Sequence, residues 1–185
     1  LVGSEMCIRD RDNTKGRIFA YDFQGNMLYA FGGHGYKAGL FMNPSAIEDI
    51  GDSLLVTDQK LGTITQFTLT DYGKMINDGL AEYKKGNYDE SANIWRKVLK
   101  HNGNYDQAYI GIGRALLREK NYKEAMDYFE LKLDAKNYSK AFKLYREVWF
   151  EENIGTILII IAILILLGFG VGSVSYTHLR AHETS

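Results

Sequence analysis

The spacing of apolar residues divides the chain into stretches of different secondary structure. Residues 12–73 carry short apolar runs separated by Gly, Asn and Asp, which is the pattern of strands joined by tight turns. The runs that predict strands are 17–21, 27–31, 45–47, 53–57 and 63–67. We expect an antiparallel β-meander in this stretch.

Residues 74–153 follow a helical period and contain an internal repeat. With a shift of 34 residues, Gly79 falls on Gly113 and Trp95 falls on Phe129. Large aromatic residues at this spacing are typical of a packed core between helices. The repeat therefore predicts two helical hairpins of similar structure.

A third Asn-Tyr pair, at Asn137, follows the second pair too soon to begin a full third repeat. We expect one further helix from this point, because short helical arrays need a cap over their last hairpin. The aromatic residues that would pack it onto the second hairpin are Phe142, Tyr145 and Trp149.

The apolar stretch 154–173 begins with 19 uncharged residues, enough for about 28 Å of helix against a hydrocarbon core of about 30 Å. It predicts one transmembrane helix. A buried core helix is the weaker interpretation, because the small helical region offers little to surround it. No Pro separates this stretch from the preceding helix, and Gly155 costs only about 1 kcal/mol in a helix, so we expect one continuous helix into the membrane.

The two ends, 1–11 and 174–185, match neither period. Both resemble the translation of a sequencing adapter, so we expect them to have no defined structure and to be no part of the fold. Cys7 belongs to the first of them. On this interpretation the natural part of the chain is a fragment.

Charge and composition narrow the function classes. With 22 Lys and Arg against 23 Asp and Glu, the chain lacks the basic excess of a nucleic-acid-binding protein. One Cys and four His are too few for a cysteine-rich zinc site. No arrangement of nucleophile and base is evident, so we expect no catalytic site, metal site or cofactor in this stretch of chain.

Four short motifs in the strand region combine Gly, Asn or Asp with apolar residues: Gly16-Arg17-Ile18, Tyr21-Asp22, Asn43-Pro44-Ser45-Ala46-Ile47 and Leu55-Val56-Thr57-Asp58. They resemble NHL repeats of six-bladed β-propellers. The resemblance implies the last two strands of one blade and the first three of the next, which is an incomplete all-β propeller over 12–73. Any ligand site on the propeller axis would then lie in missing blades.

The same resemblance, extended to propeller lactonases, would make Asp22, Asp58 and His34 calcium ligands. We favour another role for the aspartates, because an Asp at the end of a strand commonly caps the following turn. The glycine-rich stretch 32–35 is not followed by a predicted helix, so we interpret it as a loop and not as a phosphate-binding site.

The helical repeat resembles the tetratricopeptide-repeat family. The family's pattern implies that a Gly in each first helix allows close approach, and that Tyr88 and Tyr122 fill the turns. Ala125 matches its small packing residue, where the first repeat has Ser91. The expected fold class is thus a mixed, multi-domain fragment: an incomplete propeller, tetratricopeptide-like hairpins over 74–153, and one transmembrane helix.

Repeats of this family bind peptides along their first helices. The residues that the resemblance places in such a groove are Tyr83, Lys84, Gln107, Ile110, Arg114 and Arg118. Arg114 and Arg118 are four residues apart, on one helix face, and could hold a carboxylate or an acidic peptide. The alternative is a solvated charged face, since Glu82 and Glu119 are close in sequence.

The whole layout resembles surface-anchored proteins of Gram-positive bacteria, often encoded beside carbohydrate transporters. The resemblance implies a single-pass membrane protein that binds or scaffolds a protein, a peptide or a carbohydrate-related ligand. It makes transporter components candidate partners and places the repeats outside the cytoplasm. Charges before the span are balanced and do not set its orientation. The alternatives are a propeller lactonase or lyase with its site in missing blades, and a cytoplasmic assembly platform.

Overall fold

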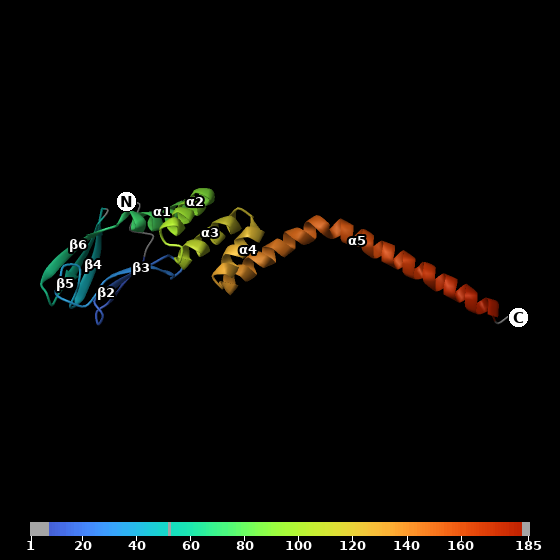
Figure 1. Cartoon of the computed structure of the whole chain (residues 1–185), viewed down its shortest axis with the longest axis horizontal. Coiled ribbons are helices and arrows are strands. Elements are labelled where there is room, and N and C mark those ends of the chain that lie inside the picture. The colour runs from blue at the N-terminus through green and yellow to red at the C-terminus, as the bar shows by residue number, and fades with distance from the viewer. Residues whose placement is uncertain (1–7, 52, 183–185) are drawn as a thin grey trace. The chain divides into compact units, whose positions relative to one another are not determined.

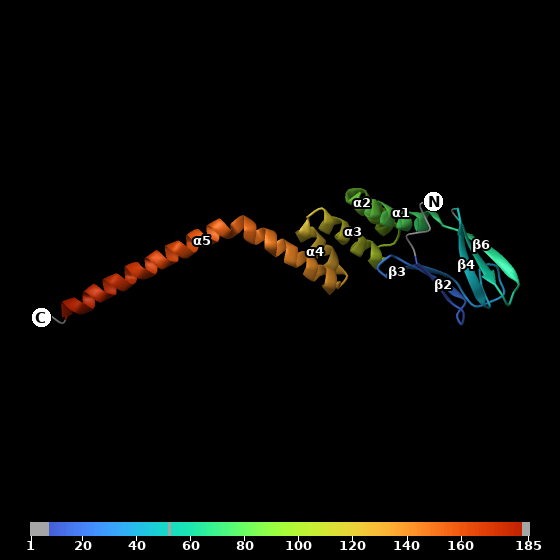
Figure 2. The same cartoon turned by 180° about the vertical axis from the view of Figure 1, so that it is seen from behind.

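The computed structural model describes residues 8–51 and 53–182. Two small antiparallel sheets precede five helices along the chain (Figure 1; Figure 2 gives the opposite view). The chain divides into two compact units, with the boundary between Ala141 and Phe142 inside the last helix.

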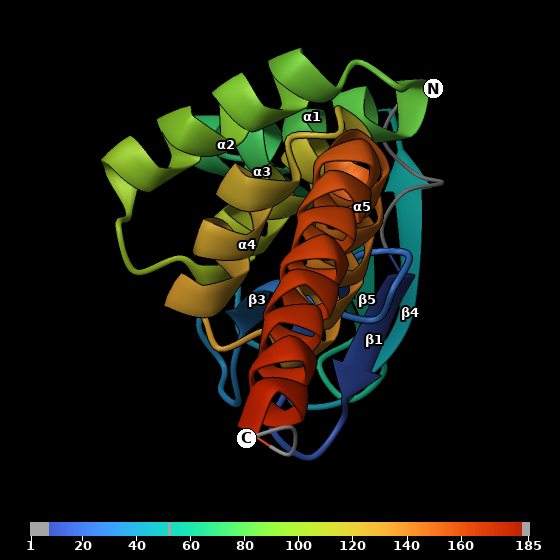
Figure 3. The same cartoon turned by 90° about the vertical axis from the view of Figure 1, so that its right-hand side faces the viewer.

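Each sheet has three strands joined in sequence order. The first sheet contains β1 (Ile8–Asp12), β2 (Arg17–Tyr21) and β3 (Met27–Gly32), and the second contains β4 (Pro44–Ile50), β5 (Ser53–Asp58) and β6 (Thr63–Thr68). The five strands that the apolar runs predict are therefore confirmed. β1 and β4 lie side by side (Figure 3), and the Arg9 guanidinium pairs there with the Asp49 carboxylate.

Alternating side chains give the strands one buried face. In β5, Leu54 and Val56 point inward and are buried. They form a cluster with Ile18 of β2 and Phe41 of the loop between the sheets, so the two sheets share a core. The Phe67 ring of β6 closes this core, with its centroid 5.7 Å from that of Phe41.

The expectation of an incomplete propeller over 12–73 is wrong. A propeller blade has four strands, whereas each sheet here has three, and the chain enters a helix at Asp71 soon after β6. Alternating apolar residues and turn glycines specify hairpins locally. They do not determine how many strands join a sheet or whether the sheets surround an axis.

The expectation that the chain ends have no defined structure is also wrong where the structure describes them, whereas their resemblance to an adapter stays a prediction. Residues 8–11 belong to β1, which pairs with β2 in a regular antiparallel register from Ile8 opposite Tyr21 to Asp12 opposite Arg17. At the other end, residues 174–182 continue the last helix. Residues 1–7 and 183–185 lie outside the described part of the chain.

The first four helices form two successive hairpins, as the internal repeat predicts. They are α1 (Asp71–Lys85), α2 (Tyr88–His101), α3 (Asp106–Arg118) and α4 (Tyr122–Leu131). The side chain of Thr70 caps α1, and Gly86 ends it in the left-handed region at φ 91°. The residue one repeat later, Lys120, has φ 65°, so both hairpins turn with the same backbone conformation.

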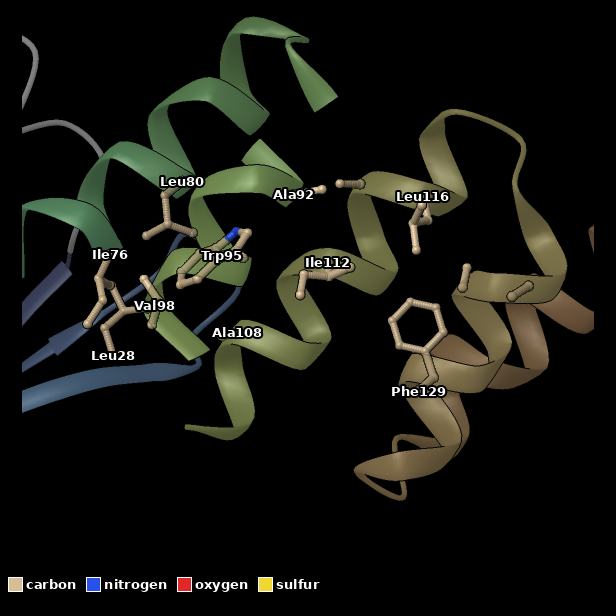
Figure 4. Close-up of a cluster of buried hydrophobic side chains, with 13 residues drawn as sticks. Leu28, Ile76, Leu80, Ala92, Trp95, Val98, Ala108, Ile112, Leu116 and Phe129 are labelled. Atoms are coloured by element: carbon tan, nitrogen blue, oxygen red, sulfur yellow. The ribbon is translucent and has the colours of Figure 1, made fainter. Parts of the chain in front are cut away.

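Glycine lets the two helices of each hairpin approach closely. A Cβ built on Gly79 would lie 2.9 Å from Trp95 Cε2, and one on Gly113 would lie 2.6 Å from Phe129 Cε1. Both aromatic side chains are buried in the helical core (Figure 4). The Ser91 hydroxyl, where the second repeat has Ala125, donates a 2.7 Å hydrogen bond to the Gly79 carbonyl oxygen. This bond explains how the core tolerates a polar residue there.

The last helix, α5, is continuous from Ala135 to His182. It begins two residues before Asn137, and the Asp134 carboxylate accepts a 3.1 Å hydrogen bond from the Asn137 N–H. The expected cap is present, but its packing face differs from our expectation. Ala141 is buried in the helical core and Tyr138 packs against it, whereas Phe142 and Trp149 are exposed.

Candidate peptide-binding surface

The six residues expected to line a groove all lie on α1 and α3, the first helices of the two hairpins. The side chains of Lys84 and Arg118 are exposed. The other four, Tyr83, Gln107, Ile110 and Arg114, are partly buried. A hydrogen bond joins Tyr83 and Arg118, whereas Arg114 bonds to a residue outside the six.

Tyr83 and Arg118 come together across the two hairpins. The Arg118 Nε–H donates a 3.2 Å hydrogen bond to the Tyr83 hydroxyl oxygen, and this bond raises the pKa of Arg118. The Tyr83 ring also packs edge-on against Tyr88, with centroids 5.3 Å apart. Glu82 bonds instead to Lys85. The pair formed by Tyr83 and Arg118 is therefore an accessible cation beside an aromatic ring.

Arg114 is occupied by a residue of the same chain. Its Nη1 lies 3.2 Å from Asp22 Oδ2, and the two side chains are only 11% and 2% exposed. Among the described residues, the Arg114 Nε is a buried nitrogen without a hydrogen-bond partner. No sequence pattern predicts this ion pair, because its residues lie on different elements, 92 positions apart.

Asp22 is held as a carboxylate by the turn that follows β2. Burial raises the pKa of its carboxyl, but hydrogen bonds from Asn26, Gln24 and Arg114 outweigh this effect, and the pKa lies below its usual range. Its Oδ1 accepts the backbone N–H groups of Gln24 and Asn26, each at 2.8 Å. The turn-capping role expected for this residue is thus confirmed.

Asp58 caps the turn after β5 in the same way. It is buried, and its carboxylate accepts four backbone N–H groups, those of Met42, Asn43, Lys60 and Leu61, at 2.6 to 3.0 Å. Burial raises the pKa of Asp58, but these bonds outweigh that effect and lower it. Within the described residues, no three His, Cys, Asp or Glu side chains are grouped as a metal site requires.

The β2–β3 hairpin, residues 17–32, contacts the helices at further points. The Tyr105 hydroxyl at the start of α3 donates a 2.7 Å hydrogen bond to the Leu28 carbonyl oxygen. The Leu28 side chain is only 4% exposed and belongs to the helical core, beside Ile76 and Val98 in Figure 4. Tyr29 lies 3.4 Å from Asn77 through its hydroxyl. These contacts were not expected from the sequence.

A cleft of about 610 Å³ lies between the two sheets and α1. Its walls carry the aromatic side chains of Tyr29, Phe31, Phe67 and Tyr72, together with polar groups of α1. Its size is within the range of clefts that hold small molecules. The Tyr72 hydroxyl is buried and has no hydrogen-bond partner among the described residues.

Comparison with known families bears on the helical region. Residues 77–140 match the tetratricopeptide repeat family model. No curated protein matches the chain. The match agrees with the repeat spacing and with the paired glycine–aromatic contacts of the two hairpins. It supports a protein-binding or scaffold role for this part of the chain.

Proposed function

We propose that this chain is a membrane-anchored binding or scaffold protein whose helical repeats hold a protein or peptide partner. The repeat match over 77–140 is the observation that supports the partner class. The open pair formed by Tyr83 and Arg118, with Lys84 beside it, offers a partner one cation, an aromatic ring and a second cation. An acidic peptide segment has the matching charge.

The proposed anchor is the apolar part of α5, residues 154–173. By length and composition, the helix between Ala135 and Gly168 is able to cross a membrane. Apart from the partly buried Ile157, its large apolar side chains up to Leu167 are exposed, from 46% at Ile161 to 71% at Leu166, so it is not a core helix in the described structure. Trp149 and Phe150 precede the apolar stretch, where aromatic rings favour the headgroup region.

The lactonase or lyase alternative required propeller blades, whereas the described residues form two three-stranded sheets. A carbohydrate-related ligand and transporter components stay predictions. A position of the repeats outside the cytoplasm is supported only by the layout of repeats before a C-terminal span, and the reverse orientation would make them a cytoplasmic platform.

Alkaline extraction tests the anchor. The full chain, expressed in bacteria, should stay with the membrane pellet at high pH, and a chain ending at Asn153 should be released. A matched pair of variants sharpens the test: Ile161→Asp and Leu164→Asp together should weaken retention, whereas Lys140→Asp and Lys143→Asp should not. Release of the full chain would refute the anchor.

Partner binding is tested separately, at the open pair. A photo-reactive residue in place of Lys84 should cross-link to the same partner as one in place of Arg118, and a residue on the opposite helix, at Lys97, should not. Arg118→Glu should weaken the cross-link from position 84, because it reverses the charge beside Tyr83. Equal cross-linking from all three positions would contradict a localised binding surface.

A further inference from the structure

The helices contact the β2–β3 hairpin through hydrogen bonds, one ion pair and apolar packing. We call the surface that makes them the hairpin-binding face, formed by Asn77, Tyr105 and Arg114 with the helical core around Leu28. The face offers one cation, one hydroxyl donor and one apolar site.

The strands and the helices have separate hydrophobic clusters. Ile18, Phe41, Leu54 and Val56 form the buried cluster of the sheets. Leu28 is the one strand residue among the buried members of the helical cluster in the described part of the chain. Removing the hairpin from the helices would therefore expose Leu28 and the part of Tyr29 that packs against the helical core, and leave the buried cluster of the sheets in place.

The ion pair between the hairpin and the helices uses only part of the hydrogen-bonding capacity of Arg114. Asp22 reaches Arg114 through a single nitrogen, Nη1, and leaves the buried Nε without a partner. A carboxylate can engage an arginine through two parallel N–H groups, which is the stronger arrangement. The present ion pair thus does not use the full capacity of Arg114.

We propose that the hairpin-binding face recognises an extended or hairpin segment of a partner that carries a carboxylate and, six residues later, an aliphatic side chain. Within the same chain, the β2–β3 hairpin occupies this face. The proposal rests on the protein-binding function above and adds the chemistry of the partner. A partner segment binds by replacing Asp22 at Arg114 and Leu28 in the helical core. The hairpin therefore inhibits binding until a stronger segment competes.

The probe for this proposal is a fluorescent synthetic peptide of residues 17–32, which carries both Asp22 and Leu28. It is titrated against the full chain in detergent micelles. In the wild-type chain the face is already occupied, so binding is weak. In a chain with Asp22→Asn and Leu28→Ala, the chain's own hairpin is weakened, and we expect at least tenfold tighter binding of the peptide.

Three matched controls assign the binding to this face. A peptide that itself carries Asp22→Asn should bind the double variant at least tenfold more weakly, because it lacks the carboxylate. Adding Arg114→Gln to the double variant should remove the advantage of the unmodified peptide. Lys97→Gln, at an exposed position of α2 outside the hairpin-binding face, should leave peptide binding unchanged.

Hydrogen exchange and circular dichroism make the negative outcomes informative. If the double variant keeps its helical signal and residues 22–29 exchange rapidly, absence of peptide binding overturns the proposal. If residues 22–29 stay protected, the hairpin is a permanent part of the fold, which also overturns it. If the double variant loses its helical signal, the peptide is titrated instead against the chain with Asp22→Asn alone. Failure of the peptide to bind that variant overturns the proposal.

This result is separable from the proposed function. Retention of the chain in the membrane and cross-linking from Lys84 do not depend on the hairpin. Their success together with failure of the peptide titration would leave a membrane-anchored binding protein whose partner uses only the open pair. Failure of cross-linking together with peptide binding would place the partner site on the hairpin-binding face instead.

Discussion

Replacement of Phe129 by Ala should destabilise the repeats strongly, and the size of the effect should depend on Gly113. Phe129 is fully buried, and loss of such a ring costs about 3–5 kcal/mol through the cavity it leaves. That is a large fraction of the total stability of a small domain, which is about 5–15 kcal/mol. The change should lower the free energy of unfolding accordingly.

The coupling to Gly113 follows from one distance. A Cβ at position 113 would lie 2.6 Å from Phe129 Cε1, so Gly113→Ala alone should cost about 1–3 kcal/mol by overpacking. In the Phe129→Ala background the clash is gone, and Ala favours a helix over Gly by about 1 kcal/mol. Gly113→Ala should then stabilise the protein, a reversal of sign.

Urea unfolding of the full chain in detergent micelles measures this cycle, with far-UV circular dichroism reporting the repeat helices. The control is Gly103→Ala, where the nearest atom to a new Cβ is the Leu99 carbonyl oxygen at 3.8 Å. Its effect should be the same in both backgrounds. Equal costs of Gly113→Ala with and without Phe129 would refute the close packing of α3 against this ring, and the repeat assignment that depends on it.

Three further predictions concern the backbone, pH and the last helix. Lys120 has a left-handed φ, which an L-residue adopts at a cost, so Lys120→Gly should stabilise the repeats by about 1 kcal/mol in the same assay. Gly86→Ala, at the equivalent position of the first repeat, should destabilise them. The pKa of Asp58 in the folded protein lies below its unfolded value, so the ionised carboxylate stabilises the fold above about pH 4, and this contribution is lost as the pH falls further. Asp58→Asn should therefore reduce the dependence of the free energy of unfolding on pH in the acid range. An unchanged dependence would contradict the hydrogen bonds assigned to Asp58. Spin labels at Leu144 and Ile160 should give a narrow distance distribution centred at about 24 Å, because sixteen residues of continuous helix separate them. A broad distribution would indicate that the helix is flexible at Gly155.

Local patterns predicted the elements of this fold well. Turn glycines and alternating apolar residues located five strands, and the glycine–aromatic spacing located two helical hairpins, because each signal acts between near neighbours in the chain. β1 was missed because its sequence was attributed to an adapter. The propeller was wrong because sheet size depends on which strands join, a property that no local pattern contains.

The candidate site was predicted less well for the same physical reason. Helical spacing placed Arg114 and Arg118 on one face, but it could not show that Asp22 pairs with one of them. Leu28 looked like an ordinary strand residue, and only the structure shows it in the helical core. Contacts between elements far apart in sequence depend on packing between them.

Labelling of single cysteines in sealed vesicles tests the membrane anchor most directly. With Cys7 replaced by Ser, one chain carries Ser139→Cys and another carries Ile161→Cys. A membrane-spanning α5 predicts that a membrane-impermeant maleimide labels position 139 from one side of the vesicle only, and that it labels position 161 from neither side until detergent is added. Labelling of position 161 in intact vesicles to the same extent as position 139 would contradict a membrane-spanning α5 and, with it, the proposed function.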